Sequence, residues 1–213
     1  PPHDLQAIQK FFTPPPFRYR LTRAEALANY TKAAKLCADA MKDKPKADDI
    51  SALRDRRIIA LLGMWNTACE PRYLEEAVKE SKAALAATPA PGAPGTVPKA
   101  LVPGADVVAR FCLANEALRN GGDPEVILSD LIEQSGGERA PASALAAAAI
   151  LALGANASTA HETYGQRLLS MEENLNPALW PVYAFLRDHH HCYRNFWATP
   201  GGFGYVRSQK YEY

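Results

Sequence analysis

Apolar residues recur at steps of three and four along most of this chain, and this periodicity restricts the fold more than any other feature. The apolar positions of the first such segment are Leu27, Tyr30, Ala34, Cys37 and Met41. They lie on one face of an α-helix. Similar segments follow up to about residue 196, and Pro, Gly or capping residues separate them. The sequence therefore predicts an all-α protein, and its 38 alanines favour helix as well.

Helix starts can be placed from their capping residues. Thr22 with Glu25, and Thr159 with Glu162, have the spacing of a capping box. Pro71, Pro124 and Pro141 are suited to the first helical position. The predicted helices span about 22–44, 48–69, 71–87, 105–120, 123–135, 141–154, 159–175 and 176–196.

A proline-rich segment divides the helical part of the chain. Residues 88–104 hold five prolines and three glycines, which cannot sustain a helix. We therefore expect a long loop between a first helical half, 22–87, and a second, 105–197. Three consecutive prolines predict an extended N-terminal segment over 1–21, and residues 198–213 are expected to form an extended C-terminal tail.

Short connections between successive helices predict antiparallel helical hairpins. Stacked hairpins form a helical-repeat array. An irregular helical bundle is the alternative arrangement of the same helices.

The segment Tyr73–Pro89 resembles the second helix of a tetratricopeptide repeat. Ala77 and Ala84 occupy the small-residue positions of that family, and Pro89 its proline position. The alanines let two helices approach closely, and the proline ends the second one. Ser81 departs from the pattern, because the family prefers a bulky residue there.

Other segments match this family in part. Leu62-Gly63 resembles its Leu-Gly pair, although the distance to Ala77 differs from that of a standard repeat. The further matches are Ala26, Tyr30 and Ala33, and then Ala160 and Tyr164, with Arg167 in place of the third residue. The spacings of 51 and 83 residues do not follow the usual period of about 34. The resemblance covers about three helix pairs and implies a degenerate, tetratricopeptide-like (TPR-like) array.

Charge and hydropathy exclude two classes of partner. The chain has 24 Lys and Arg against 23 Asp and Glu, without the concentrated basic face of a nucleic-acid-binding protein. Its most apolar run, Ala144–Leu153, is too short for a membrane span. We expect no nucleic acid partner and no membrane insertion.

Because the chain starts at Pro1, any targeting segment is not in this chain, and the localisation is unknown, as is the oligomeric state.

Every residue of the run from Asp188 to Cys192 has a side chain that can ligate a metal ion. Helical spacing brings Asp188 and Cys192, or His189 and Cys192, onto one face, as two metal ligands require. Asp188, His189, His191 and Cys192 are therefore candidate metal ligands. A tetrahedral site would need two more ligands from elsewhere, so the alternative is a solvated helix end.

The chain has no dinucleotide, phosphate-loop or hydrolase signature, and no cofactor or catalytic residue is predicted.

Aromatic residues gather at the two ends of the chain. Residues 1–21 hold four of the 19, and residues 180–213 hold ten. They predict either a terminal cap on the helical array or a binding surface. For the second case the partner-binding candidates are Tyr183, Tyr193 and Trp197.

The sequence also predicts the solvent exposure of two smaller sets of residues. Cys37, Cys69 and Cys112 fall on apolar helical faces, which predicts small buried side chains, while the disulfide status of the four cysteines stays open. The charged run 54–57 falls mostly off the apolar face, which predicts a solvated surface.

These features favour a non-enzymatic helical-repeat scaffold that binds a protein or peptide partner. Two alternatives stay open: a helical accessory domain of a larger enzyme, and a metal-binding protein that uses the 188–192 run.

Overall fold

The computed structural model describes residues 7–8, 10–12, 22–43, 45–87 and 106–171. Within these ranges every regular element is a helix and no strand occurs, which confirms the all-α class for the described part of the chain. The elements are α2 (Arg23–Lys42), α3 (Ala47–Ala68), α4 (Pro71–Ala87), α5 (Val107–Arg119), α6 (Pro124–Gln134), the 3₁₀ turn η1 (Gly137–Arg139), α7 (Ala142–Gly154) and α8 (Ser158–Leu169). The predicted last helix and C-terminal tail lie outside the described residues.

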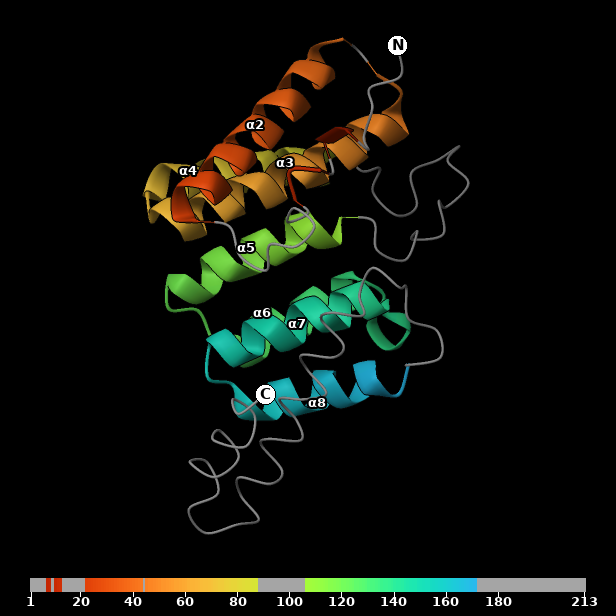
Figure 1. The fold of residues 1–213 in the computed structure, drawn as a ribbon. Coiled ribbons are helices and arrows are strands. Elements are labelled where there is room, and N and C mark those ends of the chain that lie inside the picture. The colour runs from red at the N-terminus through yellow and green to blue at the C-terminus, as the bar shows by residue number, and fades with distance from the viewer. Residues whose placement is uncertain (1–6, 9, 13–21, 44, 88–105, 172–213) are drawn as a thin grey trace, which may run out of the picture. The chain divides into compact units, whose positions relative to one another are not determined.

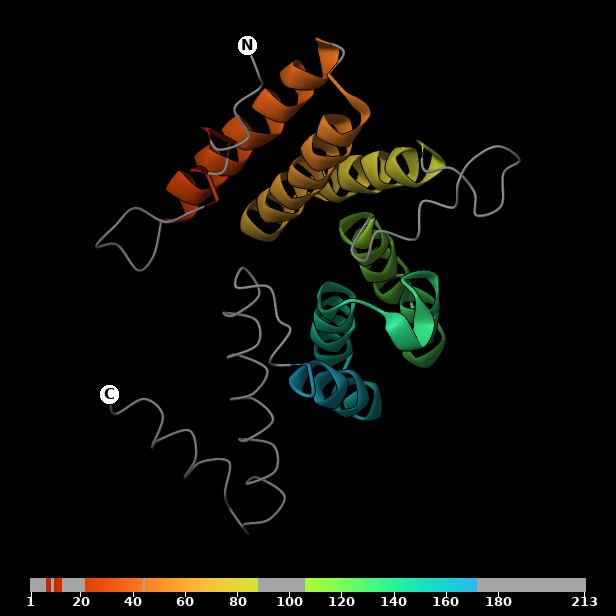
Figure 2. The ribbon, with the colours of Figure 1, turned by 90° about the vertical axis from the view of Figure 1, so that its right-hand side faces the viewer.

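The chain divides into two compact units, Pro1–Asn120 and Gly121–Tyr213. In the first unit, α2 packs on α3, α3 on α4 and α4 on α5, and α3 also touches α5 (Figures 1 and 2). The guanidinium of Arg119 on α5 lies 4.5 Å from the ring centre of Trp65 on α3. Helix α5 therefore belongs to the first unit.

In the second unit, α6 packs on α7 and α7 on α8. Helix α7 is the alanine-rich segment, and most of its surface is covered by protein. Its buried residues are Ala144, Leu145, Ala146, Ala147, Ala148, Ala149, Leu151 and Ala152. Small side chains let neighbouring helices approach from several sides, so this helix needs no polar face.

Most of the predicted helix starts are confirmed. Thr22 and Glu25 form both hydrogen bonds of a capping box, and Asp123 caps α6 with Pro124 in the first turn. The capping box expected at Thr159 is wrong, because α8 begins one residue earlier and has Ala157 at its N-cap. The amide of Ala157 donates to the carbonyl of Ala152 at 2.9 Å, so the chain turns tightly after α7 and enters the helix at Ser158.

The end of α6 depends on two glycines. Gly136 and Gly137 have φ angles of 123° and 59°, which L-residues with a Cβ rarely adopt. This pair turns the chain into η1, a short element that the sequence pattern did not indicate.

The first unit has a core of mostly small and aliphatic side chains. Its buried members are Ile8, Ala33, Ala34, Cys37, Ala40, Leu53, Ile58, Ala60, Leu61, Leu62, Met64, Ala77, Val78, Ala84, Ala109 and Cys112. Ile8 comes from the N-terminal segment, which was expected to be extended over 1–21. In its described part, residues 7 and 8 are helical, and the amide of Phe11 donates to the carbonyl of Ile8 at 3.1 Å.

The cysteines divide by exposure. Cys37 and Cys112 are buried, as predicted, and burial raises the pKa of the Cys37 thiol to about 11. Burial also raises the pKa of the Cys112 thiol. The expectation of a buried Cys69 is wrong: it is exposed, because it follows the last turn of α3 as the C-cap, in a left-handed conformation with φ 59°.

This difference predicts selective thiol chemistry. In a Cys192→Ser background at pH 8, a maleimide reagent should modify Cys69 in the native protein. Cys37 and Cys112 should react after denaturation, since a buried thiol is shielded and its thiolate is disfavoured. Peptide mass spectrometry before and after urea measures both. Native labelling of Cys37 at the rate of Cys69 would contradict the packing of α2.

Candidate functional site

The site residues proposed from the sequence lie outside the part of the chain that the structure describes. This holds for the partner-binding candidates Tyr183, Tyr193 and Trp197, and for the metal candidates Asp188, His189, His191 and Cys192. Both sets stay predictions. Among the residues that are described, no group of three or more His, Cys, Asp or Glu side chains could hold a metal ion.

The charged run 54–57 is not the solvated surface expected from the sequence. The side chains of Arg54 and Arg57 are 25% and 20% exposed, and both face helix α4. Arg57 forms ion pairs with Glu76 and Glu80. The Nε atom of Arg54 lies 3.5 Å from a carboxylate oxygen of Glu80. The run therefore joins α3 to α4, since the apolar face of α3 is wide enough to bring these residues to its edge.

Asp55 has the most perturbed carboxyl among the described residues. Burial, and to a smaller extent the charge of Asp106, raise its pKa to about 6, and the guanidinium of Arg56 opposes both. Asp106 is itself buried at the start of α5, with φ 65°. A carboxyl that titrates near neutral pH is common at functional sites and also in structural charge networks. Here it couples the stability of the first unit to pH.

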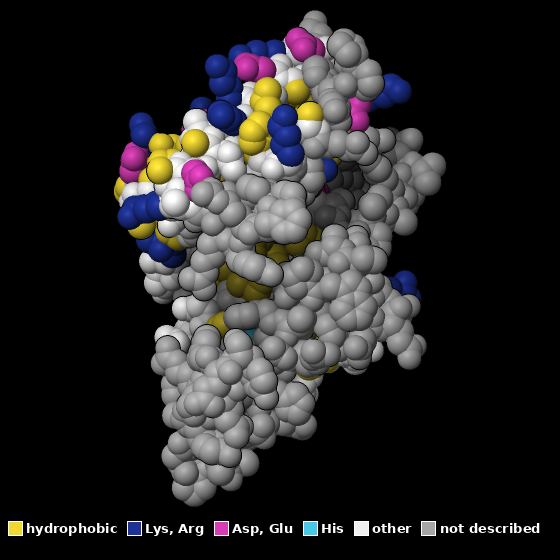
Figure 3. Space-filling view, in the orientation of Figure 1, with side chains coloured by type: hydrophobic (Ala, Val, Ile, Leu, Met, Phe, Trp, Pro, Cys, Tyr) yellow, Lys and Arg dark blue, Asp and Glu magenta, His cyan; other side chains and the backbone are white. Residues whose placement is uncertain are grey.

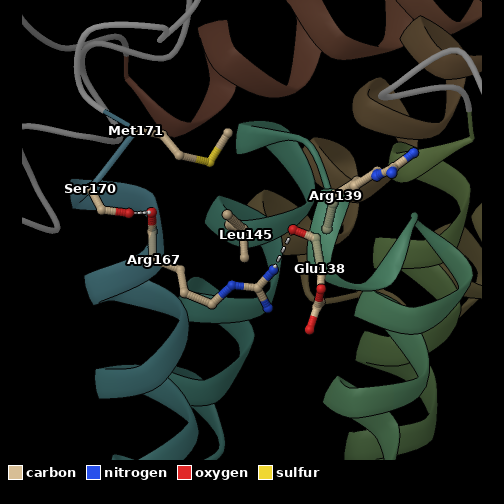
Figure 4. A pocket seen from close by; sticks show the side chains of 7 residues that line it. Glu138, Arg139, Leu145, Arg167, Ser170 and Met171 are labelled. Carbon is tan, nitrogen blue, oxygen red and sulfur yellow. Dashed lines mark hydrogen bonds between the residues drawn. The ribbon is translucent and has the colours of Figure 1, made fainter.

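A cavity of about 250 Å³ opens in the second unit (Figure 4). Its wall includes Arg139, Leu145, Arg167, Ser170 and Met171. An Nη2 hydrogen bond of 3.0 Å joins Arg167 to the carbonyl of Gly137 in η1, and the hydroxyl of Ser170 donates to the carbonyl of Arg167 at 2.7 Å. The bond of Arg167 joins α8 to η1, whereas the bond of Ser170 lies within the end of α8. Arg167, which departs from the repeat pattern, thus has a structural role that sequence spacing did not reveal.

A buried histidine lies between α7 and α8. His161 is 5% exposed, and its Nδ1 is 2.8 Å from the carbonyl oxygen of Ala149. A carbonyl can only accept, so Nδ1 carries the proton in this contact. The bond fixes α8 along α7.

The first unit exposes large aliphatic side chains on two adjacent helices. Leu36 on α2 and Ile59 on α3 are each 42% exposed. Figure 3 shows hydrophobic side chains among Lys, Arg and acidic groups over the helices of this unit. Such mixed surfaces are typical of protein contacts as well as of ordinary protein exteriors.

A docking contact occurs where α2 crosses α3. The ring of Tyr30 lies against Gly63, where an added Cβ would be 2.7 Å from ring atoms. The ring of Phe12, from the N-terminal segment, is 6.1 Å from that of Tyr30 at a tilt of 48°. The Leu62-Gly63 pair noted in the sequence therefore permits a close helix crossing. We call this place, around Tyr30 and Gly63, the α2–α3 seam.

Comparison with known proteins gives no relative: no family model, no curated protein and no solved structure matches the chain. Within the described residues, no helix is both long and apolar enough to cross a membrane.

Proposed function

We propose that this protein is a non-enzymatic helical scaffold, with a TPR-like arrangement of hairpins, that binds a protein or peptide partner. The observation that carries the proposal is the packing order of the first unit. Helix α2 packs on α3, α3 on α4 and α4 on α5, and α3 also touches α5. Arrays of this kind present a continuous surface formed by several helices, and that surface suits another polypeptide.

The exposed aliphatic residues of this unit support the same proposal. Leu36 and Ile59 project from successive helices and are each 42% exposed. Aliphatic side chains at the centre of an interface contribute to binding because contact removes their surface from water. The residues of the 188–192 run and the aromatic C-terminal region lie outside the described part and add no support.

The test starts from affinity capture. The full chain is used to retain proteins from an extract of its source cells, and each partner identified by mass is then purified. Isothermal titration calorimetry measures direct binding of that partner to the full chain. We expect Leu36→Asp or Ile59→Asp to weaken binding by about tenfold or more, as for loss of an interface residue worth about 1.4 kcal/mol.

Matched controls place the same charge elsewhere on the same helices. Ala28→Asp on α2 and Ser51→Asp on α3 change exposed positions and should leave affinity close to that of the wild type. Circular dichroism verifies that each variant is folded. The proposal fails if no retained protein binds the purified chain directly.

A further inference from the structure

We propose that residues 7–8 and 10–12 are a resident ligand of the α2–α3 seam, and that the seam accepts from a partner a short helical turn with apolar residues at i, i+3 and i+4. This inference rests on the proposed function, and it specifies the kind of polypeptide that the first unit would bind. The N-terminal segment would hold the seam closed until such a partner displaces it.

The sequence of the segment has the required pattern. Ile8, Phe11 and Phe12 stand at i, i+3 and i+4, positions that share one face of a helical turn. Residues 7 and 8 are helical, and the amide of Phe11 donates to the carbonyl of Ile8 at 3.1 Å. Apolar anchors at these spacings are the usual way in which a helix binds a groove on another protein.

The apolar residues of the segment are buried or half-buried, whereas its lysine is exposed. Ile8 is 4% exposed within the core of the first unit, and Phe11 and Phe12 pack against that core. Lys10 is exposed, and its ammonium lies 5.1 Å from the ring centre of Phe11. The turn therefore has an apolar side towards the helices and a charged side towards water.

The seam provides a receiving surface for this turn. The ring of Tyr30 lies 6.1 Å from that of Phe12 and also lies against Gly63, which has no side chain to push the ring away. Figure 2 shows the short red N-terminal segment beside α2. A single helical turn of a few residues is not stable alone in water, so contact with the hairpin stabilises the turn formed by Ile8 and Phe11.

A segment that is ordered by docking competes with any partner of the same chemistry. Its tether gives it a high effective concentration at the seam. A partner therefore binds with an apparent affinity reduced by the fraction of molecules whose seam is free. If the segment occupies the seam in about nine molecules of ten, removing it should strengthen partner binding about tenfold.

The experiment uses the full chain and a labelled synthetic peptide of residues 5–13 as the probe. Ile8→Asp in the full chain should eject the segment, because a charge at this buried position is costly. By fluorescence anisotropy, we expect the Ile8→Asp protein to bind the peptide about tenfold more tightly than the wild type does. The matched control is Lys10→Ser, which changes an exposed residue of the same segment and should bind as the wild type.

Two further variants locate the binding. A peptide that carries Ile8→Asp should bind neither protein. Adding Tyr30→Ala to the Ile8→Asp protein should weaken peptide binding about tenfold or more, because the ring that meets Phe12 is lost. Equal binding of the peptide by the wild type and the folded Ile8→Asp protein would overturn the inference.

Folding of the variants is part of the test. If Ile8→Asp unfolds the chain, Phe12→Ser replaces it, because Phe12 is half-buried and its loss is milder. If neither variant folds, the segment is an integral part of the core rather than a displaceable ligand, and the inference is overturned. Unfolding is monitored by circular dichroism before each titration.

The outcomes separate this inference from the proposed function. A cellular partner that binds the wild type, the Ile8→Asp protein and the Tyr30→Ala variant equally would preserve the scaffold function and overturn the seam as its site. Peptide binding at the seam without any protein partner would support the resident ligand while the scaffold function fails.

Discussion

Replacing Ala77 by leucine is expected to lower the free energy of unfolding by about 3 kcal/mol. Ala77 on α4 has no exposed surface and belongs to the core of the first unit. A leucine there adds three carbon atoms where neighbouring helices are already in contact, so side chains must leave their preferred rotamers or the helices must separate.

The same substitution six residues later provides the control. Ala83 lies on the same helix but is exposed, and alanine and leucine have similar helix propensities. Ala83→Leu should therefore change the free energy of unfolding by less than about 0.5 kcal/mol. Urea denaturation followed by circular dichroism gives both values. Equal stability of the two variants would show that α4 does not pack on its neighbours through Ala77.

Ala77 also shows why the helices could be predicted. Its position matches a small-residue position of the repeat pattern, where two helices approach closely. The helix starts at Thr22, Pro71 and Asp123 could be predicted equally well. A cap is a local interaction between residues two or three apart in the chain, so the sequence shows it directly. Local signals of this kind determine helices largely without reference to the rest of the fold.

The contacts between distant residues could not be predicted in the same way. The pairing of Arg57 with Glu80 depends on the angle at which α4 crosses α3, and periodicity placed the arginine on the surface. The ring of Phe12 reaches Tyr30 across 18 positions of sequence. Asp55 and Asp106 come together because α5 packs on α3. Each contact follows from tertiary packing, for which the sequence holds no short-range pattern.

Replacing Asp55 by asparagine is expected to stabilise the protein at neutral pH but not at acidic pH. Burial, and then the charge of Asp106, raise the pKa of Asp55 from 3.8 to about 6. The folded state therefore holds a proton on this carboxyl between about pH 4 and 6, where the unfolded state has lost it. The stabilisation from that proton is complete below about pH 4 and disappears as pH rises through 6.

The size of the effect follows from the same values. A rise in pKa from 3.8 to about 6 corresponds to about 3 kcal/mol. Asp55 keeps some exposure to solvent, which screens its charge, so we expect a gain of about 1–2 kcal/mol for Asp55→Asn at pH 7.5. Urea denaturation at pH 4 and pH 7.5 measures the difference from the wild type.

Asp39 provides a contrasting carboxyl. It is exposed, and its hydrogen bond with Lys42 holds the pKa of this carboxyl below its usual range. Its charged form is the favoured one in the folded state, so Asp39→Asn should not stabilise the protein at pH 7.5. A gain for Asp39→Asn equal to that for Asp55→Asn would mean that the loss of any one negative charge, rather than the burial of Asp55, causes the effect.

Replacing Asp106 tests the cause of the raised pKa at Asp55. Asparagine tolerates the left-handed backbone that Asp106 adopts, so Asp106→Asn removes the charge with little strain. The carboxyl of Asp55, followed by carbon-13 NMR, should then titrate at a lower pH than in the wild type. It should still titrate above the ordinary value, because burial is the larger cause and remains. An unchanged titration of Asp55 would exclude its coupling to Asp106 and with it the close approach of α5 to this part of α3.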